Sequence, residues 1–363
     1  MKGKFYRTAA AATAAVLLFC GSVGAAPSVS AGSAILTDES GLVLFEKKAD
    51  ERSLIASTTK IMTALLVCED GDLARVVRVP AEAAGVEGSS MYLKAGERLT
   101  VRELLNGLML SSGNDAAIAL AIASAGSAEK FVRRMNERAE RLGLANTHFA
   151  NPNGLDDPEN YSTARELAAL AACAMRNETF REIVSQRSAE AAGRTLTNHN
   201  HLLWLYEGAD GVKTGYTLAA GRILVSSAMR RGRRLVAVTI RDGDDWNDHE
   251  ALLDYGFGLL EDKELLPAGQ VVGQIPVVSG GKATVKLKIR EPLRLSLFPG
   301  EQPELRLCAP RFAYAPAVSG EAAGYLEILS DGTVLARQTV YYGETVARAA
   351  AAKKSLWQRI WGG

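Results

Sequence analysis

Strand-like segments flank a long helical stretch in the larger, N-terminal part of this chain. Residues 34–36 and 42–45 are apolar runs on either side of the turn Asp38-Glu39-Ser40-Gly41, which predicts a hairpin. GRILVSSAM and RLVAVTI, around a turn at residues 230–234, are two further strand-like runs. Because the strands come from both ends of this part, we expect one antiparallel sheet on which the intervening helices pack, an α+β fold.

Several signals locate helices and a loop in the stretch between the strands. Thr100, followed by Glu103, forms a capping box that starts a helix. Residues 115–142 are alanine-rich and then amphipathic at helical spacing. FANPNGLDDPEN at 149–160 is dense in Pro, Gly, Asn and Asp and predicts a loop, after which Ser162-Thr163 opens another helix.

The pattern of apolar and charged residues changes beyond ALLDYGFGLL. From about residue 265 apolar and charged residues alternate, as in VKLKIR at 285–290. Asp331-Gly332, between YLEIL and TVLARQTVYY, is a hairpin signal. We therefore expect residues 32–262 to form one domain and residues 263–345 a separate, small all-β domain.

The N-terminus has the three-part layout of a secretory signal peptide. Lys2, Lys4 and Arg7 precede an apolar run at 9–20, and small residues follow in GAAPSVSAGS. We assign residues 1–31 to the signal peptide, with cleavage after Ala25 or Ala31. An uncleaved anchor is disfavoured, because the uncharged stretch is too rich in Ala and Ser for a good membrane span. The protein is therefore expected to be exported.

Charge, cysteines and histidines exclude several classes of function. Lys+Arg 42 and Asp+Glu 41 give a net charge of +1, so there is no electrostatic case for a nucleic-acid partner. Beyond the signal, three widely spaced cysteines form neither a disulfide framework nor a metal motif. His199 and His201 could face one way on a strand, but the sequence has no H-E-x-x-H. We expect neither a metal site nor a cofactor.

The segment LIASTTKIMTALL at 54–66 places a small polar cluster at the head of an apolar run. In a helix Ser57 and Lys60 lie on one face, so the Lys60 amine would stand beside the Ser57 hydroxyl. A partly desolvated lysine is a base that can activate a hydroxyl as a nucleophile. A lone S-x-x-K is nevertheless more often an N-cap followed by a solvated lysine. The serine needs partners elsewhere in the chain.

Two further clusters supply those partners. LSSGNDAA places Ser112-Gly113-Asn114 at the end of the capped helix, and DGVKTGYTLAAGRILV places Lys213-Thr214-Gly215 at the head of a strand. S-x-x-K, S-x-N and K-T-G in this order are the signature of penicillin-recognising active-site serine enzymes. Each motif is weak alone, whereas the ordered trio in an exported protein is specific.

The chain resembles the D-alanyl-D-alanine carboxypeptidases, the low-molecular-mass penicillin-binding proteins of bacterial cell-wall metabolism. Besides the trio, the matching pieces cover nearly the whole chain: AILTDESGLVLFEKKAD, NPNGLDDPENYSTARELA, KTGYTLAAGRILV, DDWNDHEALLDYGF and the β tail. The resemblance implies a β-lactamase/transpeptidase-like domain, an antiparallel sheet with a helical subdomain, followed by the small all-β domain. It implies removal of the terminal D-alanine from peptidoglycan pentapeptide stems through an acyl-enzyme.

The resemblance also assigns roles to the motif residues. Ser57 would be the nucleophile, Lys60 the general base, and Ser112 a proton relay to the leaving amine. Asn114 would bind the substrate's backbone amide. The remaining assignments lie on one strand: Lys213 and Thr214 hold the terminal carboxylate, Gly215 permits close approach, and the backbone N–H of Tyr216 shares an oxyanion hole with that of Ser57.

Two alternative functions remain. A β-lactamase of the same fold adds a glutamate in an E-x-x-L-N setting, whereas Glu166 stands in ELAAL without an asparagine and is typical of a helix N-terminal charge. A non-catalytic wall-binding protein would have no need to keep Ser57 with Lys60. The sequence does not distinguish an enzyme for general trimming of pentapeptide stems from one that acts at a stage such as sporulation. It also leaves open whether the enzyme cuts peptidoglycan cross-links.

The C-terminal residues 346–363 predict an amphipathic helix. Val346, Leu356, Trp357, Ile360 and Trp361 share one face of a helical wheel. This resembles the family's C-terminal anchor in the outer leaflet of the cytoplasmic membrane, although a helix docked on the protein itself has the same pattern. The expected partners are therefore the peptidoglycan stem peptide, β-lactam antibiotics as covalent inhibitors, and the membrane surface.

Overall fold

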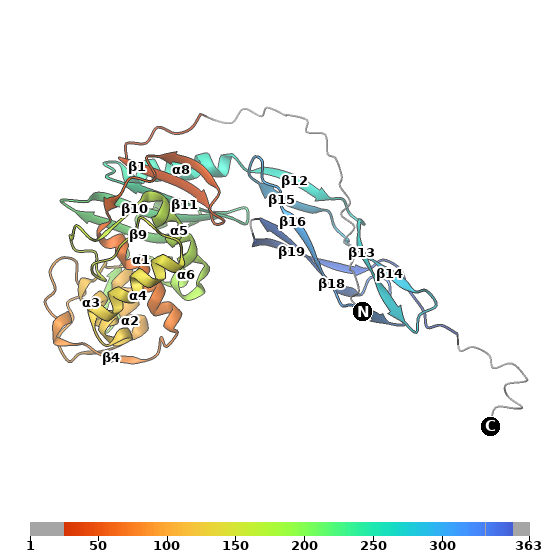
Figure 1. The fold of residues 1–363 in the computed structure, drawn as a ribbon, viewed down its shortest axis with the longest axis horizontal. Helices are drawn as coiled ribbons and strands as arrows, with labels where there is room; N and C mark the ends of the chain where they lie inside the picture. The colour runs from red at the N-terminus through yellow and green to blue at the C-terminus, as the bar shows by residue number, and fades with distance from the viewer. Residues whose placement is uncertain (1–24, 331, 351–363) are drawn as a thin grey trace, which may run out of the picture.

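The structure, a computed structural model, describes residues 25–330 and 332–350 of the chain. A domain of helices and sheet, which we call the peptidase-like domain, is followed by an elongated β domain that leads away from it (Figure 1). No helix among the described residues is long and apolar enough to cross a membrane.

A five-stranded antiparallel sheet organises the first domain, in the order β2-β1-β11-β10-β9. Its strands are β1 (Ser33–Asp38), β2 (Val43–Lys47), β9 (Ala209–Thr217), β10 (Gly221–Arg230) and β11 (Arg233–Ile240). N-terminal β1 pairs with β11, so that Ser33 lies opposite Ile240. The prediction of a sheet built from both ends of the domain is therefore confirmed. Strand β9 lies at one edge of this sheet.

Helices cover both faces of the sheet because apolar side chains alternate along its strands. Ile35 faces the larger core, which includes residues of α1 and α5, whereas its neighbour Leu36 faces a second core formed with α8. The helices are α1 (Lys60–Asp70), α2 (Val101–Met109), α3 (Asn114–Ala125), α4 (Ala128–Arg141), α5 (Ala164–Arg176), α6 (Glu178–Val184), α7 (Leu202–Leu205) and α8 (Asp245–Gly258).

The predicted helix signals are confirmed with one refinement. Thr100 and Glu103 form the expected capping box on α2, and Thr163 caps α5 by accepting a hydrogen bond from the Glu166 N–H. The stretch 115–142 contains two helices rather than one. Gly126, with a φ of +83°, ends α3 in the left-handed region, and Ser127 then caps α4.

Short ribbons and turns complete the peptidase-like domain. Three two-stranded pairs join β3 (Ser53–Leu54) to β6 (Tyr161–Ser162), β4 (Val76–Arg78) to β5 (Arg98–Thr100), and β7 (Ser188–Ala191) to β8 (Arg194–Thr197). Two 3₁₀ turns span Ala56–Thr59 and Ala81–Ala83. The sequence pattern did not predict these short elements, because they are too brief to show a period.

The second domain is built from strands throughout its described part, as predicted. One sheet has the order β16-β18-β19-β14-β13-β17, and β12 pairs separately with β15. The strands are β12 (Glu261–Leu266), β13 (Val271–Val278), β14 (Thr284–Lys288), β15 (Leu293–Leu297), β16 (Glu304–Cys308), β17 (Ala313–Tyr314), β18 (Ala322–Ser330) and β19 (Thr333–Tyr342). The antiparallel pairing of β18 with β19 confirms the predicted hairpin.

Both ends of the described chain differ from the expected boundaries. Val29 and Ala31 are buried in the second core, and the Ser30 N–H donates to Asp248 at 2.6 Å, so residues 29–31 belong to the folded domain. At the other end, buried Val346 forms a bridge with Ala317, and residues 346–350 are not helical. Bridges at Val346 and Arg348 pair this segment with the β domain, contrary to the helix expected from 346. Residues 1–24 of the expected signal and 351–363 of the expected anchor lie outside the described residues.

Candidate active site

Ser57 and Lys60 lie where a 3₁₀ turn runs into helix α1. Ser57 is within the turn Ala56–Thr59, and Lys60 is the first residue of the helix. The Lys60 Nζ donates to the Ser57 Oγ at 2.8 Å. The predicted contact of amine and hydroxyl is therefore present, although the serine sits in the tighter turn before the helix.

The Lys60 amine is fully buried and has three polar partners. Besides Ser57, it donates to the Asn114 Oδ1 at 2.7 Å and to the backbone carbonyl of Asn153 at 2.5 Å. Burial, and next the charge of Lys213, hold the pKa of Lys60 well below its ordinary value, and Asp115 opposes this only in part. A neutral lysine at hydrogen-bond distance from a serine hydroxyl can accept its proton.

The second motif lies in the loop between α2 and α3. Ser112 is nearly buried and has a φ of +57°, in the left-handed region that few residues other than glycine adopt. Asn114 begins α3, and its side chain is committed internally: its oxygen accepts from Lys60, and its Nδ2 donates to the Glu87 carbonyl at 2.7 Å. In this structure Asn114 therefore positions Lys60 rather than facing open space.

The third motif lies in the middle of edge strand β9, not at its head as expected. Lys213 is buried, and its Nζ donates to the Thr214 carbonyl at 3.0 Å. Burial lowers the pKa of Lys213 from 10.5 to about 7. A Cβ on Gly215 would lie 3.3 Å from the Ser57 nitrogen, so a glycine lets β9 approach Ser57 closely.

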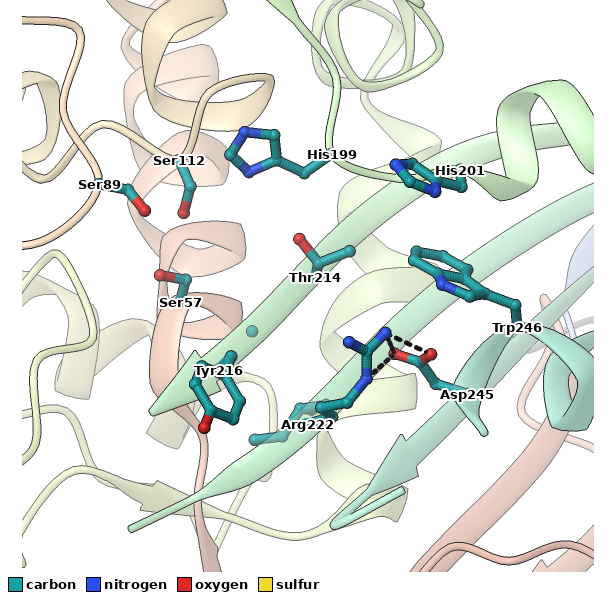
Figure 2. A pocket seen from close by; sticks show the side chains of 12 residues that line it. Ser57, Ser89, Ser112, His199, His201, Thr214, Tyr216, Arg222, Asp245 and Trp246 are labelled. Carbon is teal, nitrogen blue, oxygen red and sulfur yellow. Dashed lines mark hydrogen bonds and ion pairs between the residues drawn. The ribbon is translucent and has the colours of Figure 1, made fainter. Parts of the chain in front are cut away.

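An open cavity of about 370 Å³ joins these elements (Figure 2). It is lined by Ser57, Ser89, Ser112, His199, His201, Thr214, Gly215, Tyr216, Arg222, Ile223, Asp245 and Trp246. The structure thus brings five predicted site residues to one cavity: Ser57, Ser112, Thr214, Gly215 and Tyr216. Lys60, Asn114 and Lys213 are buried behind its wall.

Sequence reasoning missed the wall of the cavity that lies beyond Thr214 as seen from Ser57 (Figure 2). There the His201 and Trp246 rings stack with centroids 5.1 Å apart, and Arg222 donates to Asp245 at 2.6 and 2.8 Å. The two histidines had been considered only as possible metal ligands. The acid and the tryptophan stand at the start of α8, in a segment whose resemblance to the family carried no assigned role.

The loop after α4 packs against the turn that carries Ser57. Gly154 has a φ of +84°, and a Cβ there would lie 2.0 Å from the Ala56 carbonyl oxygen. The Thr63 hydroxyl donates to the Pro152 carbonyl at 2.7 Å, and Asn153 accepts from Lys60. The loop predicted at 149–160 therefore helps to fix the turn that carries Ser57.

Glu166 has a structural role in the loop that precedes its helix. Its carboxylate accepts from the Asn146 N–H at 2.9 Å and from the Thr147 hydroxyl at 2.5 Å. It is not among the residues that line the cavity. This position agrees with the interpretation that Glu166 is no deacylating base of a β-lactamase.

Comparisons with known proteins agree with the motif trio. Residues 22–244 match a family model described as D-alanyl-D-alanine carboxypeptidase, and residues 260–348 match one described as penicillin-binding protein 5, C-terminal domain. The chain is 34% identical to the D-alanyl-D-alanine carboxypeptidase DacF of Bacillus subtilis, over 88% of this chain and 86% of DacF. It is 34% identical to DacC of Escherichia coli, over 93% of this chain and 88% of DacC.

A solved structure shows the same architecture. Penicillin-binding protein 5 from Haemophilus influenzae superposes with a TM-score of 0.64 at 30% identity. The superposition covers 89% of this chain and 99% of that one, so it includes both domains. The similarity therefore extends from the motif-bearing domain to the β tail.

Proposed function

Since the chain belongs to the D-alanyl-D-alanine carboxypeptidase family of serine peptidases, we propose that Ser57 is its nucleophile and Lys60 its general base. The protein is a serine-type D-Ala-D-Ala carboxypeptidase of cell-wall metabolism. The observation that carries the residue assignment is the 2.8 Å hydrogen bond between the Ser57 Oγ and the Nζ of fully buried Lys60. The substrate is the D-Ala-D-Ala end of a peptidoglycan stem peptide.

The proposed acylation begins with neutral Lys60. Its amine takes the Ser57 proton while the Oγ bonds to the carbonyl carbon of the penultimate D-alanine. The C–N bond to the terminal D-alanine then breaks, and Ser112 relays a proton to the leaving amine. Water hydrolyses the resulting ester, which releases the shortened stem and regenerates Ser57. A β-lactam would acylate the same hydroxyl.

Strand β9 would stabilise and orient the substrate during this reaction. The N–H groups of Ser57 and Tyr216 form the proposed oxyanion hole, which the close approach of Gly215 to the Ser57 nitrogen supports. Thr214 lines the cavity and would donate to the terminal carboxylate, whereas buried Lys213 would add positive potential from behind the wall. We propose that Asn114 positions Lys60. The Asn114 side chain would bind the substrate amide only if substrate binding released it from its internal hydrogen bonds.

Release of D-alanine from a synthetic pentapeptide that ends in D-Ala-D-Ala tests this function. We expect release by the wild-type protein and none by Ser57→Ala. A fluorescent penicillin separates the alternatives: lasting label indicates the carboxypeptidase, rapid turnover a β-lactamase, and no reaction a wall-binding protein. Rapid turnover without D-alanine release would overturn the proposal.

We also propose that the enzyme is exported and held at the outer face of the cytoplasmic membrane. Because residues 29–31 pack into the domain, we expect signal cleavage after Ala25 rather than Ala31. The proposed anchor is then best tested by removing residues 351–363, since a cut at 346 would also remove a buried valine of the β domain. The shortened protein should leave the membrane fraction with its pentapeptide activity unchanged. Unchanged sedimentation with membranes after confirmed signal cleavage would refute the anchor.

A further inference from the structure

Three exposed apolar side chains cluster on the outward face of the β domain, and we call Val278, Phe312 and Tyr314 the tip cluster. Val278 and Tyr314 are register partners in the parallel pair of β13 with β17, so their side chains lie on the same face. The exposed fractions are 42% for Val278, 44% for Phe312 and 70% for Tyr314. The two aromatic rings meet edge to face with centroids 5.3 Å apart. An exposed apolar cluster of this kind is a candidate contact surface.

The tip cluster lies beside the place where the described chain ends. The Ala349 N–H donates to the carbonyl of Ser279, the residue after Val278, at 2.9 Å. Arg348 forms a bridge with Gly280 and donates to the Ala315 carbonyl. The chain leaves from the end of the β domain that is remote from the helices (Figure 1). The proposed anchor, residues 351–363, therefore begins close to the tip cluster.

Positive charge accompanies the exposed rings. Arg311 and Arg348 are both exposed. Arg311 directly precedes Phe312 in the sequence, and Arg348 donates a hydrogen bond to the carbonyl of Ala315, the residue after Tyr314. Neither arginine forms an ion pair with a residue in the ranges 25–330 and 332–350. Aromatic rings beside basic residues are typical of protein surfaces that enter the interface of an anionic bilayer.

We propose that the tip cluster is a membrane-contact surface of the β domain, which inserts into the interface of an anionic lipid bilayer beside residues 351–363. The inference rests on the proposed membrane attachment and adds a second point of contact to it. A bilayer suits the cluster better than a protein partner does, because three side chains are far fewer than the roughly 20 residues a side of a stable protein interface.

Two contacts would orient the enzyme as well as tether it. A single point of attachment leaves the domain free to tilt, whereas a tail and a tip cluster together would fix the end of the β domain against the bilayer. Strand β19 has 10 residues and so spans about 33 Å. The peptidase-like domain, at the other end, would then be held at a distance from the membrane, where stem peptides of the wall pass.

The test compares two double variants of the otherwise complete mature protein. Phe312→Ser with Tyr314→Ser removes the rings of the tip cluster. Leu305→Ser with Val334→Ser is the matched control, because these residues are 38% and 39% exposed elsewhere in the same domain. Binding is measured by co-sedimentation with vesicles of phosphatidylglycerol and phosphatidylcholine, and with phosphatidylcholine alone. Equal thermal unfolding and pentapeptide activity establish that both variants are folded.

We expect the tip variant to bind the anionic vesicles about tenfold more weakly than the control, since interfacial burial of two aromatic rings is lost. Equal binding by the two variants would overturn the proposal that the tip cluster contacts the membrane. The tail would remain the proposed anchor. Tighter binding by the tip variant would also overturn the tip-cluster proposal, because the cluster would then sequester the tail. A further variant that lacks residues 351–363 is measured in the same vesicle assay and tests the tail alone. Loss of membrane binding through the tail and through the tip cluster can therefore be told apart.

Discussion

Two lysines, Lys60 and Lys213, are buried within the candidate site, and each has a lowered pKa. Two nearby ammonium groups out of water repel one another, so at neutral pH one of them gives up its proton more easily. Lys60, in contact with the Ser57 hydroxyl, is the one placed to act as base. In the proposed mechanism Lys213 would then be the source of positive potential beside the substrate.

Lys60→Arg tests the base. We expect loss of nearly all acylation, because a guanidinium stays protonated and cannot accept the Ser57 proton. The rate of covalent labelling by a fluorescent penicillin is the measurement, and Lys47→Arg, on the remote strand β2, is the control. Labelling by Lys60→Arg within a few-fold of the wild type would show that the base lies elsewhere.

The pH dependence of kcat/KM tests Lys213. Its pKa in the folded free enzyme is about 7, so its charge is lost as the pH rises through that value. For a substrate with a free terminal carboxylate, kcat/KM should therefore decline above about pH 7. A C-terminally amidated substrate should lack this decline, because it offers no anion to attract. The same alkaline decline with both substrates would remove the carboxylate role.

Among the elements of the fold, the contact between the loop at 149–160 and the turn at Ala56–Thr59 positions Ser57. Gly154→Ala should lower the penicillin acylation rate at least about tenfold, because the new Cβ would meet the Ala56 carbonyl oxygen at 2.0 Å and displace the turn. Gly143→Ala is the control: its φ is +75°, but no atom lies within 4 Å of the added Cβ. Similar acylation rates for the two variants would contradict the positioning role.

The same elements show what a sequence pattern can and cannot predict. The capping box of α2 and the hairpin of β1 with β2 were predictable, because both depend on residues a few positions apart. The three motifs could be recognised in the sequence from their residue types and their order. The internal bonds of Asn114 and the wall of His201, Trp246 and Arg222 were not, because they depend on tertiary packing between segments remote in sequence.

At the scale of the whole molecule, a buried ion network joins the two domains. Arg233 of β11 donates to Asp38 at 3.0 Å and to both oxygens of Glu301, which belongs to the β domain, at 2.8 and 3.0 Å. The exposed fractions of these three side chains are 4% or less. The Arg233 guanidinium also lies over the Phe298 ring, at 4.7 Å from its centroid. The domains are therefore held together by charges that water does not screen.

Glu301→Ala should destabilise the protein by about 3 kcal/mol, because it leaves a buried guanidinium only partly paired. Asp262→Ala removes the partner of Arg231 in an exposed pair at the same junction and should cost much less, because water screens that pair. Thermal unfolding of the two variants is the comparison. A smaller loss of stability for Glu301→Ala than for Asp262→Ala would show that the network does not couple the domains.

The two-domain organisation was also predictable, since the period of the apolar residues changes near residue 265. The ends of the domains were less so. Val346 fits the apolar face of a helix as well as it fits the core of a β domain, and its burial beside Ala317 depends on pairing that the tail sequence does not reveal. Ala31 likewise suits both a cleavage site and a packed core.

The most direct measurement for the central claim is mass spectrometry of the protein after reaction with benzylpenicillin. We predict one covalent adduct per molecule, located on the peptide that contains Ser57, and no adduct on Ser57→Ala. Ser112→Ala should still form an adduct on Ser57, because the role proposed for Ser112 is to relay a proton and not to be acylated. An adduct at full stoichiometry on Ser57→Ala, or one located on another residue of the wild type, would contradict the assignment of Ser57 as the nucleophile.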